Sequence, residues 1–278
     1  MEYYNLRNDV KISAIGLGTY PMRPDQIIRV IPKLQKTGIN LIDTAHDYHN
    51  EKWIGIANKI SRMQNLVIST KMSVRQQKER KTRGGYTKEK LLQSLNSLGI
   101  KKLGMYLLHF PYPGSYLDCW HDMEELYKEG FVEVIGVCNC HIRHLETIKK
   151  ESEFVPFVNQ VECHPYLAQE ELLAYCRENG IQMEAYSPFA RNLPDMIYNP
   201  ILVNIADNHG KTVQQIILRW NYQRGIIPLP KASRIEHVYD NVNIFDFILN
   251  PEEMEEIKSL DRGFRIRFNP DTVDYNIL

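Results

Sequence analysis

The chain alternates short apolar runs with longer segments in which apolar residues recur at helical spacing. A short run rich in branched side chains is typical of a buried strand, and apolar residues three and four positions apart are typical of an amphipathic helix. We expect strands at residues 15–18, 39–42, 66–70, 105–108, 132–137, 158–162, 181–186 and 226–228. We expect helices at residues 25–37, 51–60, 87–98, 118–129, 141–150, 169–179, 201–209 and 212–224.

This regular alternation predicts an α/β fold in which eight parallel strands close into a (β/α)8 TIM barrel, with the active site at their carboxyl ends. Residues 2–6 and 10–13 alternate around Arg7-Asn8-Asp9, which predicts an N-terminal β-hairpin before the barrel. No low-complexity segment or linker interrupts the pattern. We therefore expect residues 1–278 to form a single domain.

Composition argues against several classes of protein. Lys plus Arg and Asp plus Glu each number 34, so no net field attracts nucleic acid or a membrane surface. No basic segment followed by an apolar run begins the chain, and no stretch approaches the roughly 18 apolar residues of a membrane span, so we expect a cytoplasmic protein. The five cysteines lack metal-binding or disulfide-type spacing, which predicts reduced thiols and no metal site.

Four ionisable residues follow the ends of three successive predicted strands, namely Asp43, Tyr48, Lys71 and His109. If those strands are parallel neighbours, the four side chains converge beyond one edge of the sheet. A lysine beside a phenol lowers the phenol's pKa from about 10, and a carboxylate keeps the lysine charged. Tyr48 would then be a general acid and His109 would orient the substrate, which indicates reduction of a carbonyl group.

Taken one at a time, these residues have ordinary structural explanations. Asp43 could cap a helix or turn, and Tyr48 could be a half-buried packing residue. Lys71 could end a strand in solvent, and His109 could be a hydrogen-bonded histidine at a sheet edge. Their joint placement is what favours a catalytic site.

Further motifs accompany these residues in a fixed order along nearly the whole chain. They are Gly16-x-Gly18-Thr19, Asp43-Thr44-Ala45-x-x-Tyr48-x-Asn50-Glu51, Thr70-Lys71, Leu107-Leu108-His109-Phe110-Pro111, Gly136-Val137-Cys138-Asn139, Asn159-Gln160-x-Glu162-x-His164-Pro165, Ala185-Tyr186-Ser187-Pro188 and Pro230-Lys231 running on to Asn241. In this order the motifs resemble the aldo-keto reductase family. The resemblance implies that Asp43, Tyr48, Lys71 and His109 form a catalytic tetrad, and that the hairpin covers the end of the barrel away from the chemistry.

The resemblance also implies a nicotinamide dinucleotide that lies extended across the barrel mouth. Gly16-Leu17-Gly18-Thr19 lacks the third glycine of a Rossmann motif, so that kind of site is not supported. Tyr186 would stack on the nicotinamide, while Asn139 and Gln160 would bind its carboxamide; Cys138 replaces the family's usual serine. The implied cofactor-binding positions are Gly18, Thr19, Asn139, Gln160, Tyr186, Ser187, Lys231, Ser233, Arg234, His237, Asp240 and Asn241.

The resemblance implies that the 2′-phosphate of the cofactor would be bound by residues near the end of the chain. By the resemblance, Lys231, Ser233 and Arg234 open the segment that holds the 2′-phosphate, and Asp240 and Asn241 match the adenine positions. His237 stands where an arginine is usual, and an imidazole with a pKa of about 6.5 is mostly neutral at pH 7. We expect NADPH to be the first choice, with NADH accepted more readily because of His237.

Substrate identity is less well defined by the sequence. The residues expected at the pocket entrance, by their nearness to the tetrad, are Tyr20, Asp47, His49, Phe110 and Tyr112. The segment 262–278 is expected to fold over that entrance, and Ser73 falls where many family members carry a bulky aromatic residue. We expect a relatively open, polar pocket for small dicarbonyls, α-keto aldehydes or sugar-derived ketones.

Residues 72–86 form a basic stretch. Its charged residues are Arg75, Lys78, Arg80, Lys81 and Arg83, and it closes on Gly84-Gly85. Such a stretch could attract an anionic substrate or a cofactor phosphate, but we favour the interpretation that it is a solvated loop.

These observations favour a monomeric NAD(P)H-dependent aldo-keto reductase that converts aldehydes or ketones to alcohols, with a small carbonyl compound as its partner. One alternative is a nucleotide-binding regulatory or sensor module on the same barrel, as in the channel-associated subunits that resemble this family. Another is a barrel enzyme of unrelated chemistry, such as hydrolysis. The intact tetrad favours the reductase, and the absence of a metal-ligand cluster or nucleophile elbow in the sequence argues against the hydrolase.

Overall fold

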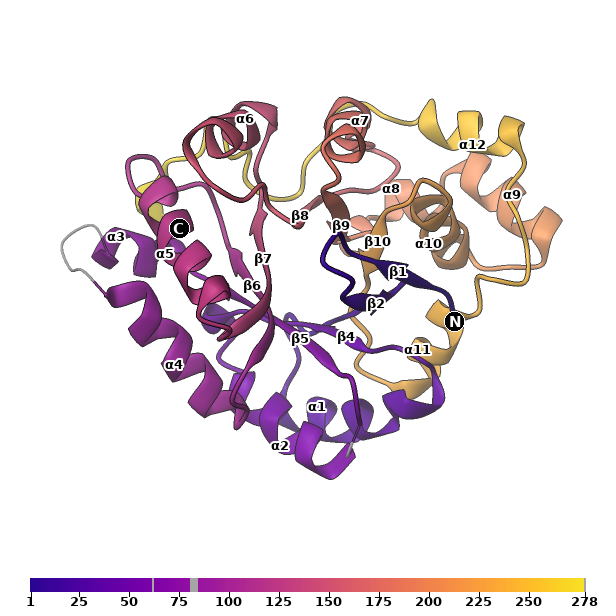
Figure 1. Ribbon diagram of the computed structural model, residues 1–278. Coiled ribbons are helices and arrows are strands. Elements are labelled where there is room, and N and C mark those ends of the chain that lie inside the picture. Colours follow the sequence, from indigo (N-terminus) through magenta and orange to yellow (C-terminus); the bar gives the residue numbers. More distant parts are fainter. Residues whose placement is uncertain (62, 81–84, 278) are drawn as a thin grey trace.

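Eight parallel strands form the centre of the molecule in the computed structural model, which describes residues 1–61, 63–80 and 85–277 (Figure 1). Neighbours in the sheet follow chain order from β3 to β10, because each strand is connected to the next through helical segments. The predicted parallel barrel is therefore confirmed. The strands are β3 (Leu17–Gly18), β4 (Leu41–Asp43), β5 (Val67–Met72), β6 (Leu103–Leu108), β7 (Val132–Cys138), β8 (Val158–Glu162), β9 (Gln182–Tyr186) and β10 (Ile227–Leu229).

Two glycines bring the first and last strands together. The N–H groups of Gly16 and Gly18 donate to the carbonyl oxygens of Pro228 and Pro230 at 3.0 and 3.1 Å. A Cβ atom on Gly18 would lie 2.7 Å from the Leu229 oxygen, so a larger residue would push the strands apart. These contacts nearly close the sheet into a barrel.

Helices surround the strands, and several begin at the capping residues that the sequence supplies. Thr212 and Gln215 form a capping box at the start of α10, and Asn250 and Glu253 form one at the start of α12. The helices are α1 (Pro24–Val30), α2 (Glu51–Ser61), α3 (Val74–Arg80), α4 (Tyr86–Leu98), α5 (Tyr116–Lys128), α6 (Ile142–Glu151), α7 (Glu170–Glu178), α8 (Pro194–Ile197), α9 (Pro200–His209), α10 (Val213–Gln223), α11 (Ile235–Val242) and α12 (Pro251–Lys258). Within the described ranges, none of them is long and apolar enough to span a membrane.

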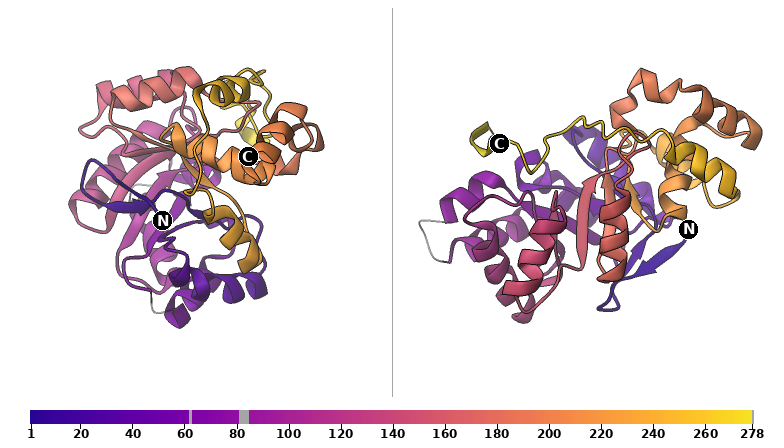
Figure 2. Two further views of the ribbon diagram at one scale, coloured as in Figure 1. Left: turned by 90° about the vertical axis from the view of Figure 1, so that its right-hand side faces the viewer. Right: turned by 90° about the horizontal axis from the view of Figure 1, so that it is seen from above.

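The predicted hairpin is also present, as β1 (Tyr3–Asn5) paired antiparallel with β2 (Lys11–Ser13). In the right-hand view of Figure 2 the hairpin and the C-terminal tail (residues 262–277) lie at opposite ends of the barrel. The two ends therefore differ in what covers them: the hairpin lies at the end where the strands begin, and the tail at the end where they finish.

The predicted helix at residues 25–37 divides into two parts. Regular α-helix ends at Val30, and residues Ile31–Lys36 form the 3₁₀ helix η1. Pro32 lacks the N–H that an α-helix needs at this point, so a tighter turn replaces the regular hydrogen bonds.

The expectation of a solvated loop at residues 72–86 was wrong for residues 74–80, which form α3. Gln76 and Gln77 are buried in it, and the Gln77 amide donates to the Phe110 oxygen at 3.0 Å. Arg80 pairs with Asp118 and Asp122 at 3.0 Å each, so its charge holds α5 rather than facing a ligand. Three of the residues named for this stretch, Lys81, Arg83 and Gly84, lie outside the described residues.

The core lies between the strands and the surrounding helices. Tyr106 and Ile135 on the strands and Trp120 and Trp220 on the helices are fully buried. Burying one side chain of this size stabilises the fold by about 1.5–3 kcal/mol. At the carboxyl ends of the strands the buried side chains become polar, and the candidate site lies there.

Candidate active site

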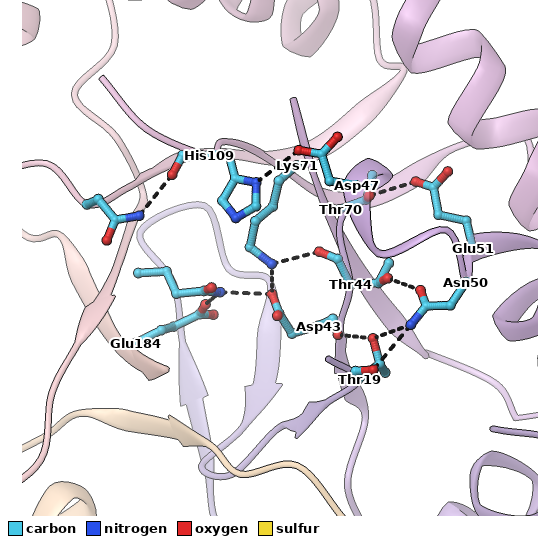
Figure 3. Close-up of polar contacts among 12 residues, drawn as sticks. Thr19, Asp43, Thr44, Asp47, Asn50, Glu51, Thr70, Lys71, His109 and Glu184 are labelled. Carbon is cyan, nitrogen blue, oxygen red and sulfur yellow. Dashed lines mark hydrogen bonds and ion pairs between the residues drawn. The ribbon is translucent and has the colours of Figure 1, made fainter. Parts of the chain in front are cut away.

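A buried ion pair joins the ends of β4 and β5. The Lys71 Nζ lies 2.6 Å from Asp43 Oδ1 and also donates to the Thr44 carbonyl oxygen at 2.7 Å (Figure 3). The Lys71 side chain is only 1% exposed. Burial lowers the pKa of Lys71, but the charge of Asp43, its hydrogen bond to the lysine and the neighbouring Tyr48 and Cys138 groups together outweigh this, so the net pKa is raised. The lysine therefore remains charged inside the barrel.

Tyr48 ends the short 3₁₀ turn η2 (His46–Tyr48) between β4 and α2. The centre of its ring lies 5.1 Å from the Lys71 Nζ. The turn is fixed by side chains of the Asn50-containing motif: Thr44 Oγ1 donates to Asn50 Oδ1 at 2.5 Å, and the Asn50 amide donates to Thr19 O at 3.2 Å. The motif therefore holds the phenol beside the lysine.

The expected effect on the Tyr48 pKa was wrong in its net direction. Burial raises the pKa of Tyr48 to about 12, while the Lys71 charge lowers it and the Asp43 charge raises it. Desolvation is the larger effect because the phenolate loses its water, and the Asp43 carboxylate partly cancels the lysine. Tyr48 consequently holds its proton at neutral pH.

His109 directly follows β6 and lies near the phenol. The His109 and Tyr48 rings are 6.0 Å apart, and His109 Nδ1 lies 4.0 Å from Asp47 Oδ2. Burial and the Lys71 charge lower the pKa of His109 to about 3. A neutral imidazole has one N–H donor and one acceptor, so His109 can donate a hydrogen bond without carrying charge. All four predicted tetrad residues thus lie together.

The predicted entrance residues are only partly gathered around the tetrad. Tyr20 lies 4.8 Å from the Tyr48 ring and Phe110 lies 5.8 Å from the His109 ring, measured between ring centres. Tyr112 lies instead against Tyr275 of the tail, at 5.7 Å. His49 is exposed, with a left-handed backbone.

The interpretation of Ser73 as a residue that opens the pocket is not supported. Ser73 is fully buried, and its hydroxyl accepts the Gln76 N–H at 3.2 Å, so it begins α3 instead of lining open space. The side chains of α3 fill this region, as the burial of Gln76 and Gln77 indicates.

The C-terminal tail crosses the end of the barrel that carries the tetrad. The backbone N–H groups of Ile266 and Arg267 donate to the two Glu162 oxygens at 2.7 and 3.0 Å. Lys78 donates to the Tyr275 carbonyl oxygen at 2.5 Å, near the end of the described chain. The right-hand view of Figure 2 shows the yellow tail running from α12 across the molecule to the C-terminus. Contacts at both ends therefore hold the tail in place.

Of the residues expected to bind the nicotinamide, Asn139 directly follows β7, Gln160 lies within β8 and Tyr186 ends β9. The Asn139 amide donates to the His109 oxygen at 2.9 Å and accepts from the Tyr186 hydroxyl at 2.8 Å. Gln160 donates to Asp43 Oδ1 at 2.8 Å. Ser187 follows β9 with a left-handed backbone. Gly18 ends β3 and Thr19 follows it, and Thr19 Oγ1 donates to the backbone carbonyl oxygen of Asp43 at 2.8 Å.

The residues expected to hold the rest of the dinucleotide surround the start of α11. Lys231 follows β10 and is exposed, and Ser233 and Arg234 directly precede the first helical residue. His237 and Asp240 are exposed on the helix, while Asn241 is buried. Backbone N–H groups and cationic side chains at a helix N-terminus are suited to an anionic group.

Two buried carboxyl groups were missed as parts of the site. Glu184 is fully buried and receives a hydrogen bond from Gln160 at 2.9 Å. Glu162 is fully buried, binds the tail and lies 2.9 Å from His164 Nε2. The sequence could have indicated Glu184, because residues 184 and 186 share a face of β9 and Tyr186 was expected to face the cofactor.

A separate hollow of about 940 Å³ lies where the strands begin. Its lining includes Lys11, Asn40, Asn58 and Gln64, which belong to the hairpin end of the barrel. It is therefore at the opposite end from the tetrad and does not belong to the candidate active site.

Comparison with known proteins gives matches along most of the chain. The model of the "Aldo/keto reductase family" matches residues 14–262. A glyoxal reductase from Bacillus subtilis (strain 168) is 38% identical over 269 residues, covering 96% of this chain and 95% of that protein. The methylglyoxal reductase DkgA of Escherichia coli (strain K12) is 34% identical over 261 residues, covering 92% of each chain. A crystal structure of a Gox0644 mutant in complex with NADPH superposes with a TM-score of 0.91 at 29% identity, covering 98% of both chains.

Proposed function

This chain belongs to the aldo/keto reductase family, and we propose that it uses NAD(P)H to reduce small aldehydes or ketones to alcohols. The observation that carries the proposal is the buried Lys71–Asp43 ion pair beside the protonated phenol of Tyr48, with neutral His109 6.0 Å away between ring centres. This arrangement can donate a proton to an oxygen that gains negative charge. The family match supports the same reaction class.

Each tetrad residue has a distinct part in the proposed reaction. A bound nicotinamide supplies the hydride for the carbonyl carbon. Tyr48 gives its proton to the carbonyl oxygen, because the alkoxide that forms there, whose conjugate acid is about as weak as water, is a stronger base than the phenolate. Lys71 stabilises the phenolate that remains, and Asp43 keeps Lys71 charged. His109 donates a hydrogen bond that orients the carbonyl oxygen.

The residues present suit a nicotinamide dinucleotide. Tyr186 offers an aromatic ring and Gln160 offers an amide beside the tetrad, while Lys231 and Arg234 place positive charge near the start of α11. We propose NADPH as the preferred cofactor, with a preference that His237 weakens because an imidazole lacks the forked, permanently charged donors with which arginine binds phosphate.

The proposed substrates are small dicarbonyls and α-keto aldehydes. Relatives named glyoxal reductase and methylglyoxal reductase support this class. The polar, partly exposed entrance at Tyr20 and Asp47 also suits a small hydrated carbonyl compound. We further propose one domain over residues 1–278, in keeping with an apolar cluster that extends from Leu6 to Ile257. A monomeric, cytoplasmic enzyme stays a prediction.

The direct test is the loss of absorbance at 340 nm with methylglyoxal and NADPH or NADH. We expect Tyr48→Phe to lower kcat by about 10²- to 10⁴-fold, the usual contribution of a general acid, without loss of cofactor binding. Tyr198→Phe is the matched control, because Tyr198 is 76% exposed. Cofactor binding without turnover in the wild-type protein would instead support a sensor module.

A further inference from the structure

Glu184 is a buried carboxyl group to which the proposed reaction gives no role. It lies on β9 opposite Gln160 of β8, and its side chain points into the barrel (Figure 3). It is 0% exposed, and its Oε1 atom has no hydrogen-bond partner in the described part of the chain. Burying a carboxyl group is costly, so its presence beside Asp43 calls for a specific reason.

The hydrogen bonds of Gln160 supply that reason. The Gln160 Nε2 donates to Asp43 Oδ1 at 2.8 Å and to Glu184 Oε2 at 2.9 Å. An amide NH₂ group has two protons, and both are directed at carboxyl oxygens. Turning the amide over would place its carbonyl oxygen against those oxygens, which is repulsive.

The orientation does not depend on the charge of Glu184. Burial and the charge of Asp43 raise the pKa of Glu184 to about 7, while the Gln160 hydrogen bond and the Lys71 charge lower it. In either protonation state Oε2 can accept the Gln160 proton, since Oε1 is available to carry the carboxyl proton. Gln160 is thus held with its own carbonyl oxygen directed away from both acids.

We propose that Glu184 is a positioning residue that fixes the Gln160 amide so that its carbonyl oxygen accepts a hydrogen bond from the carboxamide N–H of a nicotinamide cofactor. The inference rests on the proposed function. It assigns Glu184 an action through Gln160 rather than on the substrate. It also predicts a chemical preference: a cofactor whose ring carries a primary amide is favoured over one whose ring carries a methyl ketone, which has no N–H.

The test compares binding of NADPH with binding of its 3-acetylpyridine analogue, measured by quenching of protein fluorescence. We expect the wild-type protein to favour NADPH. In Glu184→Met, which lacks the acceptor oxygen, this preference should fall by about three- to tenfold, the usual weight of one hydrogen bond. Glu184→Gln keeps an acceptor oxygen and should restore most of the preference.

A double-variant cycle separates positioning from general electrostatics. In a Gln160→Met background the preference should already be low, and adding Glu184→Met should not change it further. The inference is overturned if Glu184→Met alters the preference equally in both backgrounds, or if Glu184→Gln is as impaired as Glu184→Met. Thermal unfolding identifies variants that fail to fold, and the Gln160→Met comparison with wild type then still tests whether Gln160 reads the N–H.

Failure of this inference is distinguishable from failure of the proposed function. A wild-type protein that binds neither cofactor nor analogue would contradict the proposed function itself. A wild-type protein that reduces methylglyoxal with NADPH, but whose analogue preference is unchanged in both Glu184 variants, would overturn only the role of Glu184.

Discussion

Replacing Lys71 with methionine tests whether the buried ammonium controls proton donation by Tyr48. Methionine keeps the length of the side chain but removes its charge. The Lys71 Nζ lies 5.1 Å from the centre of the Tyr48 ring. At that distance and an effective dielectric constant of about 20, a charge pair is worth about 3 kcal/mol, which corresponds to roughly 100-fold in rate if most of the phenolate's charge develops in the transition state.

The variant also leaves Asp43 without its ion-pair partner. Removing one member of a buried pair destabilises proteins by about 3–5 kcal/mol, so a loss of activity could reflect unfolding. The double variant Asp43→Asn with Lys71→Met removes both charges and should recover stability without recovering activity. Lys101→Met is a matched control, because Lys101 is exposed on the surface.

The assay is steady-state reduction of methylglyoxal by NADPH, with cofactor affinity measured separately by fluorescence. We expect kcat to fall roughly 100-fold in Lys71→Met and in the double variant, with little change in cofactor affinity. A folded Lys71→Met protein whose kcat falls less than about threefold would refute the proposed role of the ammonium.

Three further predictions concern other parts of the molecule. The pKa of Glu184 is raised to about 7, so the folded protein holds this proton more tightly than the unfolded chain does. The free energy of unfolding should therefore fall as pH rises from the ordinary carboxyl pKa toward 7. Measured by urea titration, Glu184→Gln should raise the free energy of unfolding by up to about 3 kcal/mol at pH 8 and by much less at pH 5. An equal gain at both pH values would contradict this. Glu162→Gln should release the tail, because the amide replaces one of the two carboxyl oxygens that accept the backbone N–H groups. The rate of hydrogen exchange at residues 264–268 should then rise. Glu171→Gln, a control at an exposed position on α7, should leave that rate unchanged. His237→Arg should raise the preference for NADPH over NADH in kcat/KM by about tenfold, and an unchanged ratio would place the phosphate elsewhere.

The strand order of the barrel and the place of the tetrad could be predicted because both depend on patterns repeated along the chain. Eight alternations of short apolar run and helical spacing leave few arrangements other than a barrel. Asp43, Lys71 and His109 each stand at a strand end, so a parallel sheet brings them together without any knowledge of side-chain packing. The N-terminal hairpin could be predicted from a local pattern, because alternating residues flank the short turn at Arg7-Asn8-Asp9.

What failed depended on burial, which the sequence does not display. The stretch 72–86 looks solvated because it is rich in basic residues and glutamine, yet Gln76 and Gln77 are buried in α3. The phenol of Tyr48 was expected to be acidified by Lys71, but desolvation exceeds that attraction. Glu184 was overlooked because its partner Gln160 lies 24 positions earlier in the chain.

The most direct measurement of the central claim is a single turnover with NADPH deuterated at C4 of the nicotinamide and methylglyoxal as substrate, followed by mass spectrometry of the product. We predict that the wild-type protein places the deuterium of the transferred hydride on the new carbinol carbon, and that Tyr48→Phe does so at least about 100-fold more slowly while still binding the cofactor. Product that lacks deuterium, when both C4 positions of the cofactor carry deuterium, would contradict hydride transfer from the nicotinamide. Equal rates for the wild-type protein and Tyr48→Phe would contradict Tyr48 as the proton donor.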